Sequence, residues 1–245
     1  MKISIITVTY NAEKHLEKCI QSIISQKNPN FEYIIIDGGS TDGTVDIIKK
    51  YQDHLAYWVS EPDCGIYDAM NKGIKQAKGG YIGFLGADDY FFPNMLQTLF
   101  ENIVLYKDVD FWVAPVKVNK IIKSGYKPSY QNPNDAVSTH SLGLWVKTYV
   151  FKDLNYFSLD YRICSDADFI AKLISKNFKG MTCQFNNPIG EYSTFGCSAT
   201  LRYTTNYELY LVRRNSSQGS LFLLIWLCYK QIRSFLSLTL ARIKR

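Results

Sequence analysis

The chain has 245 residues, of which 47% are hydrophobic and 20% are charged. This composition excludes a disordered, collagen-like or low-complexity protein, and the length suits one α/β domain with at most a short appendage. The net charge of +6 comes from the end of the chain: seven basic and no acidic residues follow Glu208, whereas the rest has 21 basic against 22 acidic residues. A near-neutral body excludes a nucleic-acid groove running through the fold.

The cysteine pattern and the first residues indicate the compartment. The six cysteines form no Cys-x-x-Cys pair, and the opening MKISIITVTYN turns polar after one short apolar run. We therefore expect reduced thiols, no signal peptide and a cytoplasmic location. With three scattered histidines, a Cys/His zinc site has little support.

The first hundred residues read as three strand–loop–helix units. Short runs rich in β-branched residues predict strands, and apolar residues at helical spacing follow each of them. The strands are expected at 3–8, 31–36 and 81–85, with helices near 16–24, from 45 onward and at 94–105. Strands that alternate with helices predict a mostly parallel, doubly wound α/β sheet with flanking helices.

A polar loop follows each of these strands. The loops are Thr9-Tyr10-Asn11, the glycine-rich and aspartate-rich stretch 37–44, and Gly86-Ala87-Asp88-Asp89. In a doubly wound sheet, ligands bind outside the carboxyl ends of the strands. The three loops therefore predict a ligand site at this edge of the sheet.

The loop 37–44 packs three glycines and two aspartates into eight residues. Glycines let the backbone approach a ligand closely, and carboxylates accept hydrogen bonds from ribose hydroxyls or a base N–H. The loop lacks the G-x-G-x-x-G order of a dinucleotide fold. It suits the nucleoside end of a ligand better than its phosphates, although a lone Asp-Gly turn is usually only a solvated turn.

Asp88 and Asp89 are adjacent carboxylates after a buried strand. They repel each other unless a cation or a hydrogen-bonded sugar compensates them. Mg²⁺ or Mn²⁺ takes oxygen ligands and keeps waters and substrate phosphates, so a metal-held diphosphate fits the pair. The pair alone could equally stabilise a helix N-terminus; the two other polar loops favour the metal.

Three stretches carry a family resemblance: ISIITVTYN, EYIIIDGGSTDGT and SEPDCGIYDAMNKGIKQAKGGYIGFLGADD. Over residues 3–92 they resemble the nucleotide-sugar-binding half of family 2 glycosyltransferases of the GT-A fold, of the bacterial surface-polysaccharide type. The resemblance implies a donor pocket lined by Thr9, Tyr10 and Asn11, with Asp37 on the nucleotide base. It also implies a D-x-D element with Asp88 toward the ribose and Asp89 on the metal, although Gly86 stands where many relatives carry Asp or Asn.

The segment 60–73 belongs to the same resemblance and precedes a helix expected at 66–77. Asp63 and Asp68 are its candidate cleft-lining residues. Lys72 could meet a phosphate, but an ordinary exposed lysine is the more probable interpretation.

The second half is expected to bind the acceptor. The stretch 161–173, YRICSDADFIAKL, resembles the family's base-bearing segment at the start of a helix. Asp166 is the expected catalytic base and Asp168 the alternative, because relatives often show Glu-Asp where this chain has Ser165-Asp166. In a purely structural interpretation, Ser165 and Asp168 form a capping pair. His140 has a weaker expected role on the acceptor side.

The tail reads as a basic amphipathic helix. Residues 221–229 are wholly apolar, but nine residues are far fewer than the roughly 20 that span a bilayer. We expect 220–245 to lie on an anionic membrane surface, so that the protein is peripheral at the inner face of the cell membrane. The alternative is a helix docked on the protein's own core or on a second subunit of a homo-oligomer.

These features together predict an inverting, metal-dependent glycosyltransferase that moves one sugar per event, since no Gln-x-x-Arg-Trp motif of processive relatives is present. The donor is expected to be a UDP-sugar and the acceptor a saccharide that is carried on a lipid. The expected domains are 1–215, divided into a donor half (1–110) and an acceptor half (111–215), and a helical tail (216–245). The rival hypotheses are a sugar nucleotidyltransferase, for which a basic triphosphate loop is missing, and an inactive nucleotide-sugar-binding scaffold.

Overall fold

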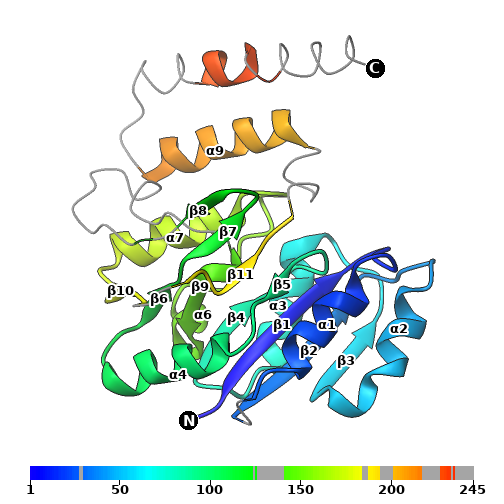
Figure 1. Ribbon diagram of the computed structural model, residues 1–245. Helices are drawn as coiled ribbons and strands as arrows, with labels where there is room; N and C mark the ends of the chain where they lie inside the picture. Colours follow the sequence, from blue (N-terminus) through cyan, green and yellow to red (C-terminus); the bar gives the residue numbers. More distant parts are fainter. Residues whose placement is uncertain are drawn as a thin grey trace.

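The structure is a computed structural model, shown in Figure 1. It describes residues 1–27, 30–123, 125, 141–183, 187–193, 201–216, 227–232 and 234.

A seven-stranded sheet forms the centre of the protein, with the strand order β10-β6-β9-β4-β1-β2-β3. Its strands are β1 (Ile3–Thr9), β2 (Phe31–Asp37), β3 (Tyr57–Ser60), β4 (Tyr81–Phe84), β6 (Phe111–Val113), β9 (Leu144–Lys147) and β10 (Gly180–Thr182). The pairs β1–β2, β1–β4, β2–β3 and β6–β10 are parallel, and β9 runs antiparallel to β4 and β6. The predicted mostly parallel sheet is confirmed.

A second sheet has four short strands in the order β5-β11-β7-β8. They are β5 (Tyr90–Phe91), β7 (Val116–Val118), β8 (Ile121–Lys123) and β11 (Gly190–Glu191). This sheet was not expected from the sequence, because runs of two or three residues are too short to show the alternation that marks a strand.

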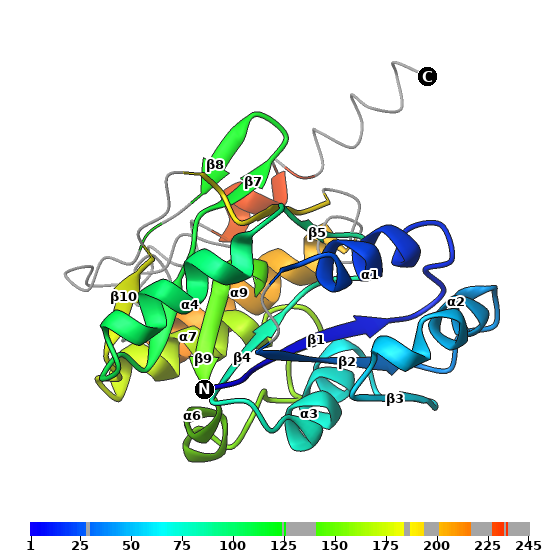
Figure 2. The same ribbon diagram turned by 60° about the horizontal axis from the view of Figure 1, so that its bottom comes forward.

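Helices cover both faces of the large sheet (Figures 1 and 2). One apolar core contains side chains of α1 (Leu16–Ile24), α2 (Thr44–Lys50) and α4 (Met95–Leu105), and the other contains those of α3 (Ile66–Gln76), α6 (Thr148–Asp153) and α7 (Ser165–Ser175). Alternate residues of β1 enter opposite cores, Ile3 and Ile5 on one face and Ile6 on the other. The described residues also form two short 3₁₀ helices, Gln52–His54 and Ser141–Gly143.

The helix α9 (Arg202–Ser216) lies outside these layers, across the end of the molecule that carries α7 (Figure 1). Residues 227–232 are helical and lie along it: Asn206 Nδ2 donates to the carbonyl oxygen of Lys230 at 3.3 Å and to Ser234 Oγ at 3.0 Å. Most of the predicted amphipathic tail lies outside the described residues. In the part of the chain that the structure describes, no helix is long and apolar enough to cross a membrane.

Gly83 is a point of close packing in the large sheet. It pairs with Trp145 across β4 and β9, and a Cβ at Gly83 would lie 2.4 Å from Cζ3 of that indole. Trp145 is fully buried, so its ring has no free space into which to move. The glycine is therefore required for the contact between these two strands.

We predict that Gly83→Ala lowers the free energy of unfolding by about 1–3 kcal/mol, the usual cost of an overpacked core. Urea unfolding followed by circular dichroism measures the change. Gly80→Ala is the matched control, because a Cβ there meets the flexible Met1 side chain at 3.3 Å. Equal stability of the two variants would contradict the prediction.

Candidate functional site

The loops after β1 and β2 are joined to each other by hydrogen bonds. Asn11 has a left-handed backbone (φ 49°), and its Oδ1 accepts from the backbone N–H of Thr41 at 2.9 Å. Its own N–H donates to Ser40 Oγ at 2.8 Å. Asn11 therefore connects the two loops at the carboxyl edge of the sheet. Its role in donor binding stays a prediction.

Asp37 is fully buried at the end of β2 and organises the loop that follows. Its Oδ2 accepts from the backbone N–H of Ser40 at 2.9 Å and from Ser60 Oγ at 2.6 Å, and its Oδ1 accepts from Ser40 Oγ. The carboxylate thus fixes the Gly38-Gly39-Ser40 turn and the end of β3. Contact with a nucleotide base stays a prediction.

Thr9 and Tyr10 differ in exposure. Thr9 is 6% exposed, and its Oγ1 has no hydrogen-bond partner among the described residues. Buried hydroxyls usually have a partner, so this one is available to a polar group that enters the edge of the sheet. The Tyr10 ring is 64% exposed, and it lines the cavity described below.

Asp63 and Asp68 come from the segment before and at the start of α3. Asp63 Oδ1 accepts from the N–H of Gly65 at 2.8 Å, and its Oδ2 lies so close to Gly38 that a Cβ there would be 2.5 Å away. Asp68 Oδ2 accepts from the N–H of Cys64 at 3.0 Å. Lys72 Nζ pairs with Glu61 at 2.8 Å and the side chain is only partly exposed, so Lys72 is a paired lysine rather than the ordinary exposed one that was expected.

The pair Asp88 and Asp89 follows β4. Asp89 is 4% exposed, and its Oδ1 accepts from the backbone N–H of Ser193, just after β11. Burial, and to a smaller extent the neighbouring charge of Asp88, raises the pKa of Asp89 to about 7. The small sheet thereby holds one carboxylate of the pair in place.

Gly86 leaves room beside both carboxylates. A Cβ at this position would lie 2.8 Å from Asp89 Oδ2 and 3.2 Å from Asp88 Oδ1. An oxygen of each carboxylate thus lies close to Gly86, and oxygens of this kind are the ligands that a hard divalent cation takes together with waters or phosphate oxygens. Within the described residues, no three His, Cys, Asp or Glu side chains gather into a complete metal site.

Residues from 1–110 and from 111–215, the expected donor and acceptor halves, meet at a cavity of about 600 Å³. The donor half contributes the loop residues named above, among them Tyr10, Gly38 and Asp63, and the acceptor half contributes Leu159–Arg162 and Glu208. Asp88 and Asp89 do not line this cavity; they lie farther along the same edge of the sheet. The cavity therefore connects the nucleoside-side loops with the segment that leads to α7.

Asp166 lies at the start of α7 and contacts the donor half through Tyr67. The Tyr67 hydroxyl is 3.0 Å from Asp166 Oδ1 and 2.6 Å from the carbonyl oxygen of Ile163, and it can donate to either. Burial raises the pKa of Asp166, and the bonds from Tyr67 and from the Ala167 N–H oppose that rise. A carboxylate with a raised pKa beside a cavity suits general-base chemistry.

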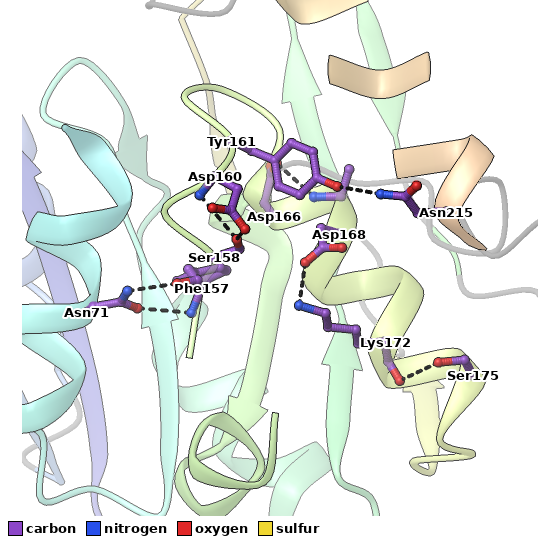
Figure 3. A network of polar contacts seen from close by, with 11 residues as sticks. Asn71, Phe157, Ser158, Asp160, Tyr161, Asp166, Asp168, Lys172, Ser175 and Asn215 are labelled. Atoms are coloured by element: carbon purple, nitrogen blue, oxygen red, sulfur yellow. Dashed lines mark hydrogen bonds and ion pairs between the residues drawn. The ribbon is translucent and has the colours of Figure 1, made fainter. Parts of the chain in front are cut away.

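Asp168 and Ser165 do not form the capping pair. Asp168 Oδ2 pairs with Lys172 Nζ at 2.6 Å, as Figure 3 shows, and Ser165 Oγ is buried without a partner among the described residues. The N-cap residue of α7, Cys164, makes no side-chain cap. Asp166 is thus the carboxylate that Tyr67 contacts, and Asp168 is held in an ion pair.

The backbone before α7 is held by Glu208 of α9. Its Oε1 accepts from the N–H of Arg162 at 2.8 Å, and its Oε2 accepts from the N–H groups of Ile163 and Cys164 at 2.8 and 3.0 Å. Sequence reasoning assigned no role to Glu208 or Tyr67. The sequence does contain a signal for Glu208: this acidic residue lies four positions before Val212, on the helix face where an apolar residue would be expected.

His140, the weaker candidate on the acceptor side, lies outside the described residues.

Solved structures share this fold. The Staphylococcus aureus protein TarS (residues 1–349, in complex with UDP-GlcNAc) superposes with a TM-score of 0.73 at 23% identity, over 88% of this chain and 65% of that one. A mannosyltransferase of Pyrobaculum calidifontis, in complex with GDP-Man and Mn²⁺, superposes with a TM-score of 0.68 at 16% identity, over 89% of this chain and 65% of that one. The expected GT-A fold is confirmed.

Similar sequences carry glycosyltransferase names. The glycosyltransferase GlyA of Streptococcus pneumoniae is 34% identical over 108 residues, which are 43% of this chain and 16% of that protein. The putative teichuronic acid biosynthesis glycosyltransferase TuaG of Bacillus subtilis is 36% identical over 104 residues, 40% of each protein. The matched region thus spans less than half of either relative.

The model of glycosyl transferase family 2 matches residues 4–152. The chain belongs to glycosyl transferase family 2.

Proposed function

We propose that this protein is an inverting, metal-dependent glycosyltransferase that moves one sugar from a nucleotide-sugar, with UDP as the nucleotide, to a saccharide acceptor. The observation that carries the proposal is the cavity where the loops after β1 and β2 meet the segment leading to Asp166. Family membership favours transfer to an acceptor over the rival nucleotidyltransferase reaction. UDP is supported by the TarS complexes with UDP and UDP-GlcNAc.

The donor would lie along the carboxyl edge of β1, β2 and β4. Thr9, with its unpartnered buried hydroxyl, and the fixed turn after Asp37 would surround the nucleoside. Asp63 and Asp68 would line the cleft beside it. Asp88 and Asp89 would hold Mn²⁺ or Mg²⁺ beside Gly86, and the bound metal would neutralise the charge of the leaving diphosphate.

Asp166 would act on the acceptor in a single displacement. The acceptor oxygen attacks the anomeric carbon from the face opposite the diphosphate, Asp166 takes the hydroxyl proton, and the bond to the diphosphate breaks. One displacement inverts the anomeric centre. Asp166 must be ionised before it can accept the proton, so its raised pKa sets the lower pH limit of the reaction.

We extend the proposal to a lipid-linked acceptor in surface-polysaccharide synthesis, with the protein peripheral at the inner face of the membrane. The basic and apolar composition of 220–245 supports contact with an anionic surface. The name of TuaG, a teichuronic acid biosynthesis protein, supports the polysaccharide assignment. The hydrogen bonds of Asn206 to Lys230 and Ser234 support the alternative in which part of the tail packs on the protein's own α9.

Asp89→Asn is expected to remove the gain in UDP affinity that Mn²⁺ provides, because it removes a charge from the metal ligands at almost constant volume. Titration calorimetry with UDP, with and without Mn²⁺, measures this gain. Asp46→Asn, an exposed position on α2, is the control and should behave as the unchanged protein. A full Mn²⁺ effect in the Asp89 variant would exclude this residue as a ligand.

Asp166→Asn is expected to keep UDP binding and to lower the transfer rate about 10²- to 10⁴-fold, the usual contribution of a general base. Measuring product formation under single-turnover conditions separates transfer from binding. Asp168→Asn should retain most of the activity, because Asp168 is paired with Lys172. The reverse ranking of the two variants would identify Asp168 as the base.

Tyr67→Phe is expected to move the acid limb of kcat/KM to higher pH. The Tyr67 hydroxyl favours the ionised form of Asp166, so its loss raises the pKa of Asp166 further and reduces activity mainly at low pH. The pH profile of kcat/KM provides the measurement. Tyr81→Phe is the control, because that buried hydroxyl donates to the Val109 carbonyl oxygen and should leave the limb unchanged. An unshifted limb in Tyr67→Phe would contradict the prediction.

A further inference from the structure

The helix α9 binds the loop 161–164 through several contacts. Asn215 Nδ2 donates to the Tyr161 hydroxyl at 3.1 Å, as Figure 3 shows, and the Cys164 thiol donates to the carbonyl oxygen of Thr205 at 3.5 Å. Val212 packs with Tyr161 and Cys164 in a small apolar cluster. The helix is therefore fixed against this loop along most of its length.

Glu208 lies in the middle of that contact. It is 7% exposed, and its carboxylate accepts three consecutive backbone N–H groups, those of Arg162, Ile163 and Cys164. Bonds from N–H groups to a carboxylate are stronger than bonds between neutral groups, and three from one loop fix its backbone geometry. The loop 162–164 thus has little freedom while Glu208 stays in place.

The same loop controls where Asp166 lies. Ile163, whose N–H binds Glu208, presents its carbonyl oxygen to the Tyr67 hydroxyl at 2.6 Å. Tyr67 in turn lies 3.0 Å from Asp166 Oδ1. The backbone before α7 is therefore held by α9 from one side and by α3 from the other, and Asp166 follows it after two residues.

We propose that Glu208 is a positioning residue: it fixes the loop 162–164 so that Asp166 stays in contact with Tyr67, which lines the cavity. The inference rests on the proposed role of Asp166 as base. Glu208 lines the cavity, but both of its carboxylate oxygens accept from the loop, so in this proposal it contacts neither the donor nor the reacting atoms. Its removal should therefore reduce the rate of transfer and leave donor binding intact.

The charge of Glu208 supplies a second readout. The groups that face Asp166 are Tyr67 of α3, Cys164 before α7 and Glu208 of α9, whereas Asp168 on the same helix is paired with Lys172. Burial raises the pKa of Asp166 most, and the like charge of Glu208 adds to the rise. Glu208→Gln should therefore move the acid limb of kcat/KM to lower pH, opposite to the shift expected for Tyr67→Phe.

The experiment compares Glu208→Ala and Glu208→Gln in the full chain. Glu208→Ala should lower kcat about 10- to 100-fold, the effect of a misplaced catalytic group, and leave the donor KM unchanged. Glu208→Gln should recover part of this loss, because its carbonyl oxygen still accepts from the loop. Amide hydrogen exchange at 162–164 should accelerate in the alanine variant.

Glu32→Gln is the matched control. Glu32 is also a buried carboxylate that accepts backbone N–H groups, those of Lys78 and Gly79, but it stands at the amino end of β2, away from the cavity. It should lower stability without changing kcat or the acid limb. Equal kcat values in Glu208→Ala and Glu32→Gln would overturn the positioning role.

Asp166→Asn separates the two proposals. Full activity of Glu208→Ala beside an inactive Asp166→Asn overturns the positioning role alone. Full activity of Asp166→Asn overturns the base assignment and, with it, the positioning role. A raised donor KM with unchanged kcat in Glu208→Ala would likewise overturn the inference, because it would place Glu208 in donor binding.

Discussion

Backbone N–H groups hold the carboxylates on which the site depends. Asp37 accepts from the turn that follows it, Asp89 from Ser193, Asp166 from Ala167, and Glu208 from three residues before α7. Neutral donors stabilise an ionised carboxylate without cancelling its charge. At Asp89 and Asp166 these bonds oppose the rise in pKa that burial causes, and so favour the charged form that a divalent cation and an acceptor proton require. If a lysine were the partner of each carboxylate, its positive charge would cancel the negative one, as in the ion pair of Lys72 with Glu61.

The polar edge of the sheet after β1, β2 and β4 could be predicted from the sequence because its information is local. Each of β1, β2 and β4 is a short apolar run, and the polar residues stand directly after it, so the strand itself determines where Asn11, Asp37 and Asp88 lie. Parallel pairing of the three strands then brings the loops to one edge. The order of strands and helices along the chain is therefore enough to predict that the three loops lie at the same edge.

The other contacts around the candidate site join distant residues, which no local pattern specifies. Tyr67 and Asp166 are 99 residues apart in the chain, and Asp89 and Ser193 are 104 apart. The purely structural alternative for Ser165 and Asp168 also fails: α7 already begins at Ser165 after the N-cap Cys164, and Asp168 pairs with Lys172. The four-stranded sheet that carries Ser193 is likewise assembled from segments too short to be recognised singly.

The helix α9 joins the tail to the site, because opposite faces of one helix make the two contacts. Asn206 and Glu208 are two residues apart, about 200° around a helix, so their side chains leave on nearly opposite sides. Asn206 binds the segment near Lys230, and Glu208 binds the loop before Asp166. A tail that changes its contact with α9 would act on the same helix that holds this loop. The boundary predicted at 215–216 therefore separates α9 from a segment that packs on it. Of α9 and the described residues 227–232 and 234, α9 alone lines the cavity.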